Sequence, residues 1–268
     1  MESYICTTCG TQFAPTESEP KQCPICRDNR QYVNPAGQQW STFDKVKKSH
    51  RVVFEKKEDH LYGIGTTPQV GIGQRALLIQ TPAGNILWDC ISLIDEATID
   101  IINSLGGIDA IAISHPHYYS SMIEWSSAFG NAPIYLHEKD QEWVQYPHKN
   151  IRFWDRTKQQ LFEGISLYNV GGHFDGGTVL HWPEGANGKG ALLTGDILQV
   201  VPDLKHVSFM YSYPNQIPLS QRAIQDITAI LEPVGYDRIY GAWWDRNILS
   251  SAKDAVDISA KRYIKAIG

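Results

Sequence analysis

Two histidines one residue apart, His115 and His117, follow an apolar run in the segment AIAISHPHYYSS. A third histidine, His173, lies in VGGHFDGG, and Asp196 ends the run LLTGD. Neutral imidazoles and a carboxylate together form a ligand set that suits zinc or iron. Because each of these residues follows a predicted strand at a turn, we expect the four side chains to converge on one edge of a sheet and bind a metal ion.

Four of the five cysteines form a second candidate metal site. The segments YICTTCG and QCPICR give the spacing C-x2-C-x13-C-x2-C, with the ligands Cys6, Cys9, Cys23 and Cys26. Four thiolates make the closed tetrahedral set that structural zinc prefers. The pattern resembles rubredoxin-like knuckles and zinc ribbons, so iron is an alternative metal, and two redox-active dithiols are an alternative to any metal. Such a site has no open position, so we expect it to hold a segment that could not otherwise fold.

The elements that must position these residues divide the chain into two parts. Residues 1–45 are polar and contain the four paired cysteines, which predicts a small zinc ribbon, and residues 50–268 are expected to form a second domain. Short apolar runs with Gly-containing turns predict strands, and apolar residues at helical spacing predict helices. Strands are predicted within 51–65, 75–90, 108–115, 132–138, 164–173, 178–183, 190–196 and 238–243, and helices at 92–107, 118–130, 219–234 and 251–268. This order indicates an α/β protein with mixed sheets.

Composition limits the range of partners. The chain has 24 basic and 29 acidic residues, a net charge of −5, which argues against nucleic acid because phosphate binding needs a basic surface. No apolar run approaches the roughly 20 residues that span a bilayer, and the first residues lack the basic and apolar regions of a signal peptide. In a reducing compartment, cysteine pairs of this spacing bind metal rather than form disulfides. We therefore expect a cytoplasmic protein without a membrane partner.

The order of motifs in the second part resembles the metallo-β-lactamase superfamily. The match covers roughly residues 58–245 and rests on SHPHYYS after a strand, GGHFDGG, LLTGD and IYGAWW, with support from GNILWDC and NAPIYLHEKD. The superfamily pattern is His-x-His-x-Asp-His, then Gly-His, then Asp after a strand, then a last His after a Gly-ended strand. The resemblance implies a four-layer αββα sandwich, of the α/β (α+β) class, with the active site at one edge between two sheets.

Carried over residue by residue, the resemblance implies a complete first metal position. The two motif histidines are His115 and His117, and the Gly-His histidine is His173. The aspartate that bridges two metals in the superfamily corresponds to Asp196.

The ligands exclusive to the second metal position are all replaced. Where the superfamily has the motif Asp and His, this chain has Tyr119 and Ser120, and the last His corresponds to Trp243 or Trp244. A second ion would keep one ligand, too few for affinity. We therefore expect a mononuclear site in this domain, with one Zn²⁺ or Fe²⁺, beside the structural Zn²⁺ of the ribbon.

Three activities fit a site with one metal. The favoured one is hydrolysis of a small ester, lactone, thioester or phosphoester by metal-bound hydroxide, since a single zinc can lower the pKa of its water to about 7. Tyr118, Tyr119 or Ser120 would donate a hydrogen bond to substrate or leaving group, and Asp175 is a candidate acid or base, or a turn-forming residue. One alternative is a non-haem iron oxygenase resembling the persulfide dioxygenases, which keep the motif Asp and His that this chain lacks. Another is a domain that binds metal and ligand, or a protein, without turnover.

Several other residues are expected near the site. Asp89, in GNILWDC, is a candidate for hydrogen-bonding a metal-ligating imidazole. Met210, Tyr211 and Tyr213 lie in a loop rich in aromatic residues and prolines, and we expect them to form pocket walls. The expected partner is a small-molecule substrate. The ribbon is a candidate for recruiting a protein partner or covering the active-site edge, and the sequence leaves association of the chain with itself open.

Overall fold

The computed structural model describes all 268 residues of the chain. They form two compact units: the first comprises Met1–Leu136 and Gln141–Phe153, and the second comprises His137–Asp140 and Trp154–Gly268. The residues of the expected ribbon belong to the first unit, together with the strands that follow them. No helix of either unit combines the length and the apolar character that crossing a membrane requires.

The first unit begins with a ribbon of short elements around the four cysteines. These elements are β1 (Tyr4–Cys6), α1 (Pro24–Arg27), β2 (Trp40–Thr42) and α2 (Phe43–Ser49). Strands β1 and β2 pair antiparallel, and Thr42 caps α2 by accepting a hydrogen bond from the amide of Lys45. Ile5 and Val46 pack with Leu93, which lies beyond the ribbon, so the ribbon shares a hydrophobic cluster with the rest of this unit.

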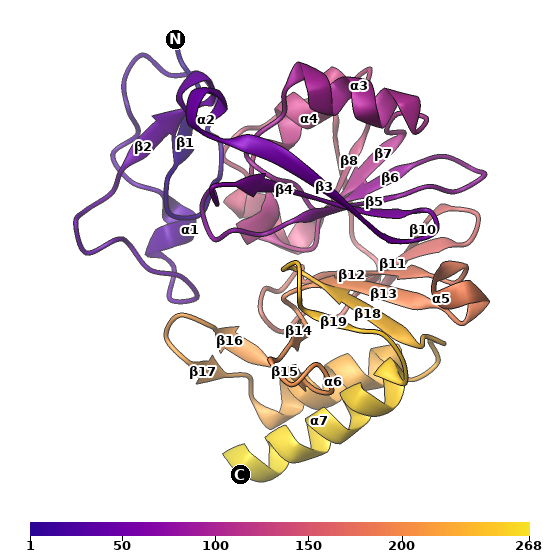
Figure 1. Ribbon diagram of the computed structural model, residues 1–268. Helices are drawn as coiled ribbons and strands as arrows, with labels where there is room; N and C mark the ends of the chain where they lie inside the picture. Colours follow the sequence, from indigo (N-terminus) through magenta and orange to yellow (C-terminus); the bar gives the residue numbers. More distant parts are fainter. The chain divides into compact units, whose positions relative to one another are not determined.

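A mixed seven-stranded sheet forms the body of the first unit (Figure 1). In spatial order its strands are β3 (Arg51–Glu58), β4 (Leu61–Thr67), β5 (Ala76–Ile79), β6 (Ile86–Trp88), β7 (Ala110–Ala112), β8 (Ile134–His137) and β9 (Ile151–Trp154). The strands from β3 to β6 pair antiparallel, and β6, β7 and β8 pair in parallel. Since parallel strands end at the same edge, the residues after β6 and β7 are brought together there.

Two helices of the first unit lie on the same side of this sheet in Figure 1, α3 (Glu96–Ser104) and α4 (Met122–Ala128). Asp95 caps α3, because its carboxylate accepts hydrogen bonds from the amide and the hydroxyl of Thr98 at 2.8 and 2.6 Å. The sequence predicts the second helix over 118–130, but α4 begins only at Met122. Pro116–Tyr118 form a single 3₁₀ turn, and Ser120 has a φ of +42°, which interrupts the helix.

The second unit contains a mixed six-stranded sheet. Its strands in spatial order are β10 (Lys158–Phe162), β11 (Ile165–Asn169), β12 (Thr178–Trp182), β13 (Ala191–Gly195), β18 (Arg238–Gly241) and β19 (Asn247–Ile248). Only β13 and β18 pair in parallel. Two small hairpins follow β13, namely β14 (Gln199–Val200) with β15 (Val207–Ser208) and β16 (Met210–Ser212) with β17 (Ile217–Pro218).

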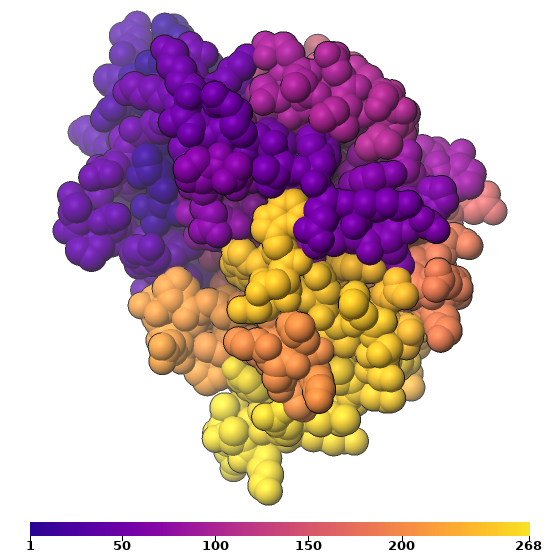
Figure 2. Space-filling model, in the orientation of Figure 1, coloured from indigo at the N-terminus to yellow at the C-terminus, as the bar shows by residue number.

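Helices α6 (Gln221–Leu231) and α7 (Ala252–Ile267) pack with this sheet, and a short helix, α5 (Gly185–Gly188), precedes β13. Ser220 caps α6, and the helix buries Ile224, Ile227 and Leu231, which recur on one face. These side chains form one cluster with residues of β12, β13, β18 and α7. The outer face of α7, drawn in yellow in Figure 2, lies at the surface, where Ile258 is 50% exposed.

Candidate metal centre

The four cysteines of the ribbon lie together, and their sulfur atoms are all within 4.8 Å of one another. The Sγ atoms of Cys6 and Cys26 are 3.6 Å apart, and those of Cys9 and Cys23 are 3.7 Å apart. A tetrahedron of sulfurs with zinc–sulfur bonds of about 2.3 Å has edges of about 3.8 Å. The cluster therefore has the spacing that a four-thiolate metal site requires, as the sequence predicts.

The chemistry of this cluster also fits a cation. Hydrogen bonds from Cys23 and Cys26 hold the pKa of the Cys6 thiol far below its ordinary value, whereas hydrogen bonding to Cys23 raises the pKa values of Cys9 and Cys26. One thiolate is thus stabilised by its neighbours, but further ionisation needs a positive charge at the centre. In addition, the Gln38 amide donates a hydrogen bond to the sulfur of Cys6 at 3.2 Å.

The first pair of histidines lies at the end of β7 in the first unit. His115 and His117 are 1% and 2% exposed, and their ring centroids are 5.1 Å apart. Burial, and secondly the positive charge of Arg30 in the ribbon, lowers the pKa of His115 well below its ordinary value. His115 is therefore neutral near pH 7, which is the form of imidazole that binds metal.

The orientation of His115 is fixed by its neighbours. The hydroxyl of Ser114 lies 3.0 Å from Nδ1 of His115, so Nε2 is the nitrogen left for a metal. Asp89, directly after β6, accepts a hydrogen bond from the amide of Ser114 at 2.8 Å, and its own amide donates to Ala112 in β7. The sequence predicts that Asp89 hydrogen-bonds a metal-ligating imidazole. The bond that Asp89 accepts from Ser114 acts one residue away, because it positions the residue before His115.

Tyr119 and Ser120, which stand where the superfamily has the motif Asp and His, are buried, as is their neighbour Tyr118. Tyr118 and Tyr119 are 0% and 2% exposed, and the Tyr118 ring packs edge-on against His115 with centroids 4.7 Å apart. The hydroxyl of Ser120 accepts a hydrogen bond from the side-chain amide of Gln74 at 2.9 Å. Unlike the carboxylate and the imidazole that the superfamily has at these positions, a protonated phenol or hydroxyl is a poor metal ligand.

His173 lies in the second unit, in the turn between β11 and β12. Its Nδ1 is 2.8 Å from the carbonyl of Tyr211 and 3.2 Å from that of Met210, so Nδ1 carries a proton and Nε2 is the nitrogen that could bind a metal. The tight turn needs glycine at position 177, where a Cβ would lie 2.5 Å from the carbonyl oxygen of Gly171. The sequence predicts that Met210 and Tyr211 lie near the site. It does not predict that their carbonyls accept hydrogen bonds from His173, because every residue has a backbone carbonyl.

Asp196 follows β13 in the same unit and is 3% exposed. The phenol of Tyr213 donates a hydrogen bond to its backbone carbonyl at 2.6 Å, and the Tyr213 ring lies edge-on to His173 with centroids 5.5 Å apart. Tyr213 therefore contacts both candidate ligands of this unit.

Asp175, Trp243 and Trp244, which the sequence also associates with the site, are less buried than the candidate ligands. The side chain of Asp175 is exposed in the turn that contains the buried His173, and its carbonyl accepts a hydrogen bond from Asn169. Trp243 and Trp244 are partly buried in the turn between β18 and β19. His137, at the end of β8, packs edge-on against Trp154 with ring centroids 4.5 Å apart.

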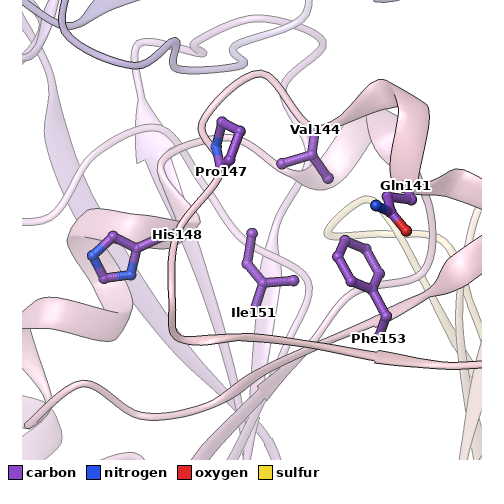
Figure 3. A pocket seen from close by; sticks show the side chains of 6 residues that line it. All are labelled: Gln141, Val144, Pro147, His148, Ile151 and Phe153. Atoms are coloured by element: carbon purple, nitrogen blue, oxygen red, sulfur yellow. The ribbon is translucent and has the colours of Figure 1, made fainter.

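A hollow of the first unit is lined by side chains from residues 141–153 (Figure 3). The lining residues are Gln141, Val144, Pro147, His148, Ile151 and Phe153. None of them is a candidate metal ligand, so this hollow is a feature separate from the candidate metal centres.

Comparison with known proteins gives the fold and a relative. No family model matches the sequence. The DIM-1 metallo-β-lactamase has a TM-score of 0.60 at 14% identity, over 81% of this chain and 98% of DIM-1. The FIM-1 metallo-β-lactamase of Pseudomonas aeruginosa in its mono-zinc form has a TM-score of 0.57 at 12% identity, over 80% of this chain and 96% of FIM-1. The uncharacterized protein YmaE of Bacillus subtilis (strain 168) is 49% identical in an alignment of 269 positions that covers 100% of this chain and 97% of YmaE.

These similarities assign the chain to the metallo-β-lactamase fold, which confirms the fold class predicted from the order of its motifs. Within that fold, the chain belongs to the same family as YmaE, with which it shares half of its residues along the whole length.

Proposed function

We propose that the chain is a metal-dependent hydrolase whose catalytic ion is held jointly by His115, His117, His173 and Asp196. The observation that carries the proposal is that each unit presents two buried candidate ligands after its strands: His115 and His117 in the first unit, with ring centroids 5.1 Å apart, and His173 and Asp196 in the second. Together these four residues are the complete ligand set of the first metal position that the superfamily resemblance implies.

The donor set supports zinc or iron, and we propose zinc both here and in the ribbon. The proton on Nδ1 of His173 and the contact of Ser114 with Nδ1 of His115 leave Nε2 of each ring as the nitrogen that would bind the ion. When bound, a divalent ion of this kind acts as a Lewis acid and lowers the pKa of water, which is the chemistry that hydrolysis needs.

A single ion in this centre is supported by the surroundings of His115 and His117. Tyr119 and Ser120 offer no anionic or imidazole ligand, and the Ser120 hydroxyl is engaged by Gln74. The fold neighbour FIM-1, in its mono-zinc form, is a metallo-β-lactamase that holds one zinc. We propose a small ester, lactone, thioester or phosphoester as the substrate, with Tyr118, Tyr119 and Asp175 as the candidate proton-donating or positioning groups.

The test combines metal analysis with turnover. Protein purified without added metal is analysed for its metal content and assayed on a panel of such substrates, beside His115→Ala. We expect two zinc ions per chain in the unmodified protein, one in the variant, and hydrolysis only in the unmodified protein. One zinc and one iron would instead indicate the oxygenase, and a fully loaded protein inert on the whole panel would contradict the hydrolase.

A further inference from the structure

The ribbon and the loop that carries His115 and His117 belong to the same compact unit and are joined by hydrogen bonds. The amide of Gln12 donates to the carbonyl of Ser120 at 3.0 Å. The side-chain amide of Gln12 donates to the carboxylate of Glu124 in α4 at 3.0 Å. Gln12 is 3% and Ser120 2% exposed, so the bond between them is protected from competition by water, and the bond to Glu124 is partly buried.

A second connection runs to the same loop from the turn of residues 6–10, which contains the first two cysteines and is called the knuckle below. The hydroxyl of Ser92 donates to the carbonyl of Gly10 at 2.7 Å, and the hydroxyl of Ser121 donates to the carbonyl of Ser92 at 3.2 Å. Both bonds are buried. The knuckle is thereby linked through Ser92 to the residue immediately before α4.

The loop needs such support because its backbone is strained at one residue. Ser120 has a φ of +42°, in the left-handed region that residues other than glycine rarely adopt. A conformation of this kind persists when its surroundings hold it. Here the carbonyl of Ser120 is held by Gln12 and its hydroxyl by Gln74.

The positions of Gln12 and Gln74, which hold Ser120, depend on the folding of the ribbon. Of its buried cluster, four members are the cysteines, and only Phe13 and Ile25 are apolar side chains of another kind. Ile5 and Val46 add packing against Leu93 outside the ribbon, but so small an apolar core is insufficient to fold the ribbon, and an ion at the cysteines would supply the remaining order. Gly71, in the segment that precedes Gln74, lies so close to the knuckle that a Cβ would be 2.9 Å from the backbone of Cys9 and Gly10.

From these contacts we propose that the ribbon is a positioning element for the histidine loop, so that metal binding at the four cysteines strengthens metal binding at His115 and His117. Gln12 and Ser92 are positioning residues that act through Ser120 and Ser121. The coupling is reciprocal, because two sites linked through one equilibrium change each other's affinity by the same factor. This inference rests on the proposed function, in that the two histidines hold a metal.

The test measures the Zn²⁺ affinity of each site in the full-length protein by competition with a chelator. Co²⁺ identifies which site fills, because only the cysteine site gives a sulfur-to-metal absorption. We expect Gln12→Ala and Gly71→Ala to weaken Zn²⁺ at the histidine site by about tenfold, the effect typical for residues that orient ligands. The ribbon must still bind its ion, which shows that each variant is folded.

Gly37→Ala is the matched control for Gly71→Ala. Both glycines have a positive φ, +93° at Gly37 and +58° at Gly71. A Cβ at Gly37 would meet no atom within 4 Å, so its substitution strains the backbone without pressing on the knuckle. We expect Gly37→Ala to leave the affinity of the histidine site within about twofold of that of the unmodified protein, because the added methyl group displaces no neighbouring atom. Unchanged affinity at the histidine site in both Gln12→Ala and Gly71→Ala would overturn the coupling. If the unmodified protein binds no ion outside the cysteines, the proposed function itself fails.

Discussion

The hydroxyl of Ser114 lies 3.0 Å from Nδ1 of His115, and the amide of the same serine donates to Asp89 at 2.8 Å. One buried residue therefore connects the ends of β6 and β7 to a candidate metal ligand. Ser114→Ala removes the hydroxyl and keeps the amide, so the ring of His115 loses its orienting partner while the strand ends stay bonded. We expect zinc affinity at the histidine site to fall about tenfold. Chelator competition measures it, and an unchanged affinity would show that Ser114 has no orienting role.

His173 is a proposed metal ligand whose ring is oriented by backbone carbonyls. His173→Ala should therefore remove stoichiometric metal from the main centre and leave the ion of the ribbon in place. His181→Ala is the matched control, since Nε2 of His181 bonds the carbonyl of Gly235 at 2.8 Å in the same unit. Metal analysis after gel filtration compares the two. Equal metal contents in the two variants would show that His173 is not a metal ligand.

Loss of one cysteine should unfold the ribbon rather than weaken it gradually. Structural zinc contributes about 10–16 kcal/mol to the folding of small zinc modules. Cys23→Ser should therefore release the ribbon's ion and expose Trp40 and Trp143, which pack on the cysteine cluster. Tryptophan fluorescence and limited proteolysis within residues 1–45 follow the change. Cys90→Ser, at a buried cysteine outside the cluster, should keep both the metal and the protease resistance of the ribbon.

The stability of the second unit should fall at acidic pH, in part through His137. Burial lowers the pKa of His137 below its ordinary value. The amide of Lys139 lies 3.4 Å from Nδ1, and Nε2 lies 3.3 Å from the carbonyl of Arg156, an arrangement that fits the neutral ring. Because the folded-state pKa lies below the unfolded value of about 6.5, this contribution is complete above pH 6.5 and is lost as the pH falls through the folded-state pKa.

His137→Gln should therefore reduce the drop in the free energy of unfolding between pH 7 and pH 5. Urea denaturation at several pH values measures it, with His60→Gln at an exposed turn as the control. Any acid release of metal affects both variants alike, so their difference isolates His137. A pH profile in His137→Gln identical to that of the unmodified protein would contradict the assignment.

Much of the fold and of the site follows from the sequence, for reasons that particular residues make plain. The apolar run before His115 and the Gly-rich turn around His173 mark strand ends, and the fold brings such ends to sheet edges. The Cys-x-x-Cys spacing likewise predicts a cluster whose sulfurs meet. In each case the residue types themselves supply the ligand atoms, so their pattern in the sequence is sufficient to predict a candidate metal site.

The supporting contacts could not be predicted in the same way. The partner of His173 is the backbone carbonyl of Tyr211, a group that every residue possesses. The late start of α4 depends on the left-handed Ser120, whose conformation is held by Gln12, more than a hundred positions earlier. Long-range bonds of this kind have no local signature, and they decide how firmly the histidine loop is positioned.

The most direct test of the central claim is a crystal structure of the purified protein with anomalous scattering recorded at the absorption edges of zinc and iron. We predict two metal ions per chain: one among the four cysteines, and one bound by His115, His117, His173 and Asp196. A second ion beside the histidine centre, or a centre in which any of these four side chains is not a ligand, would contradict the account.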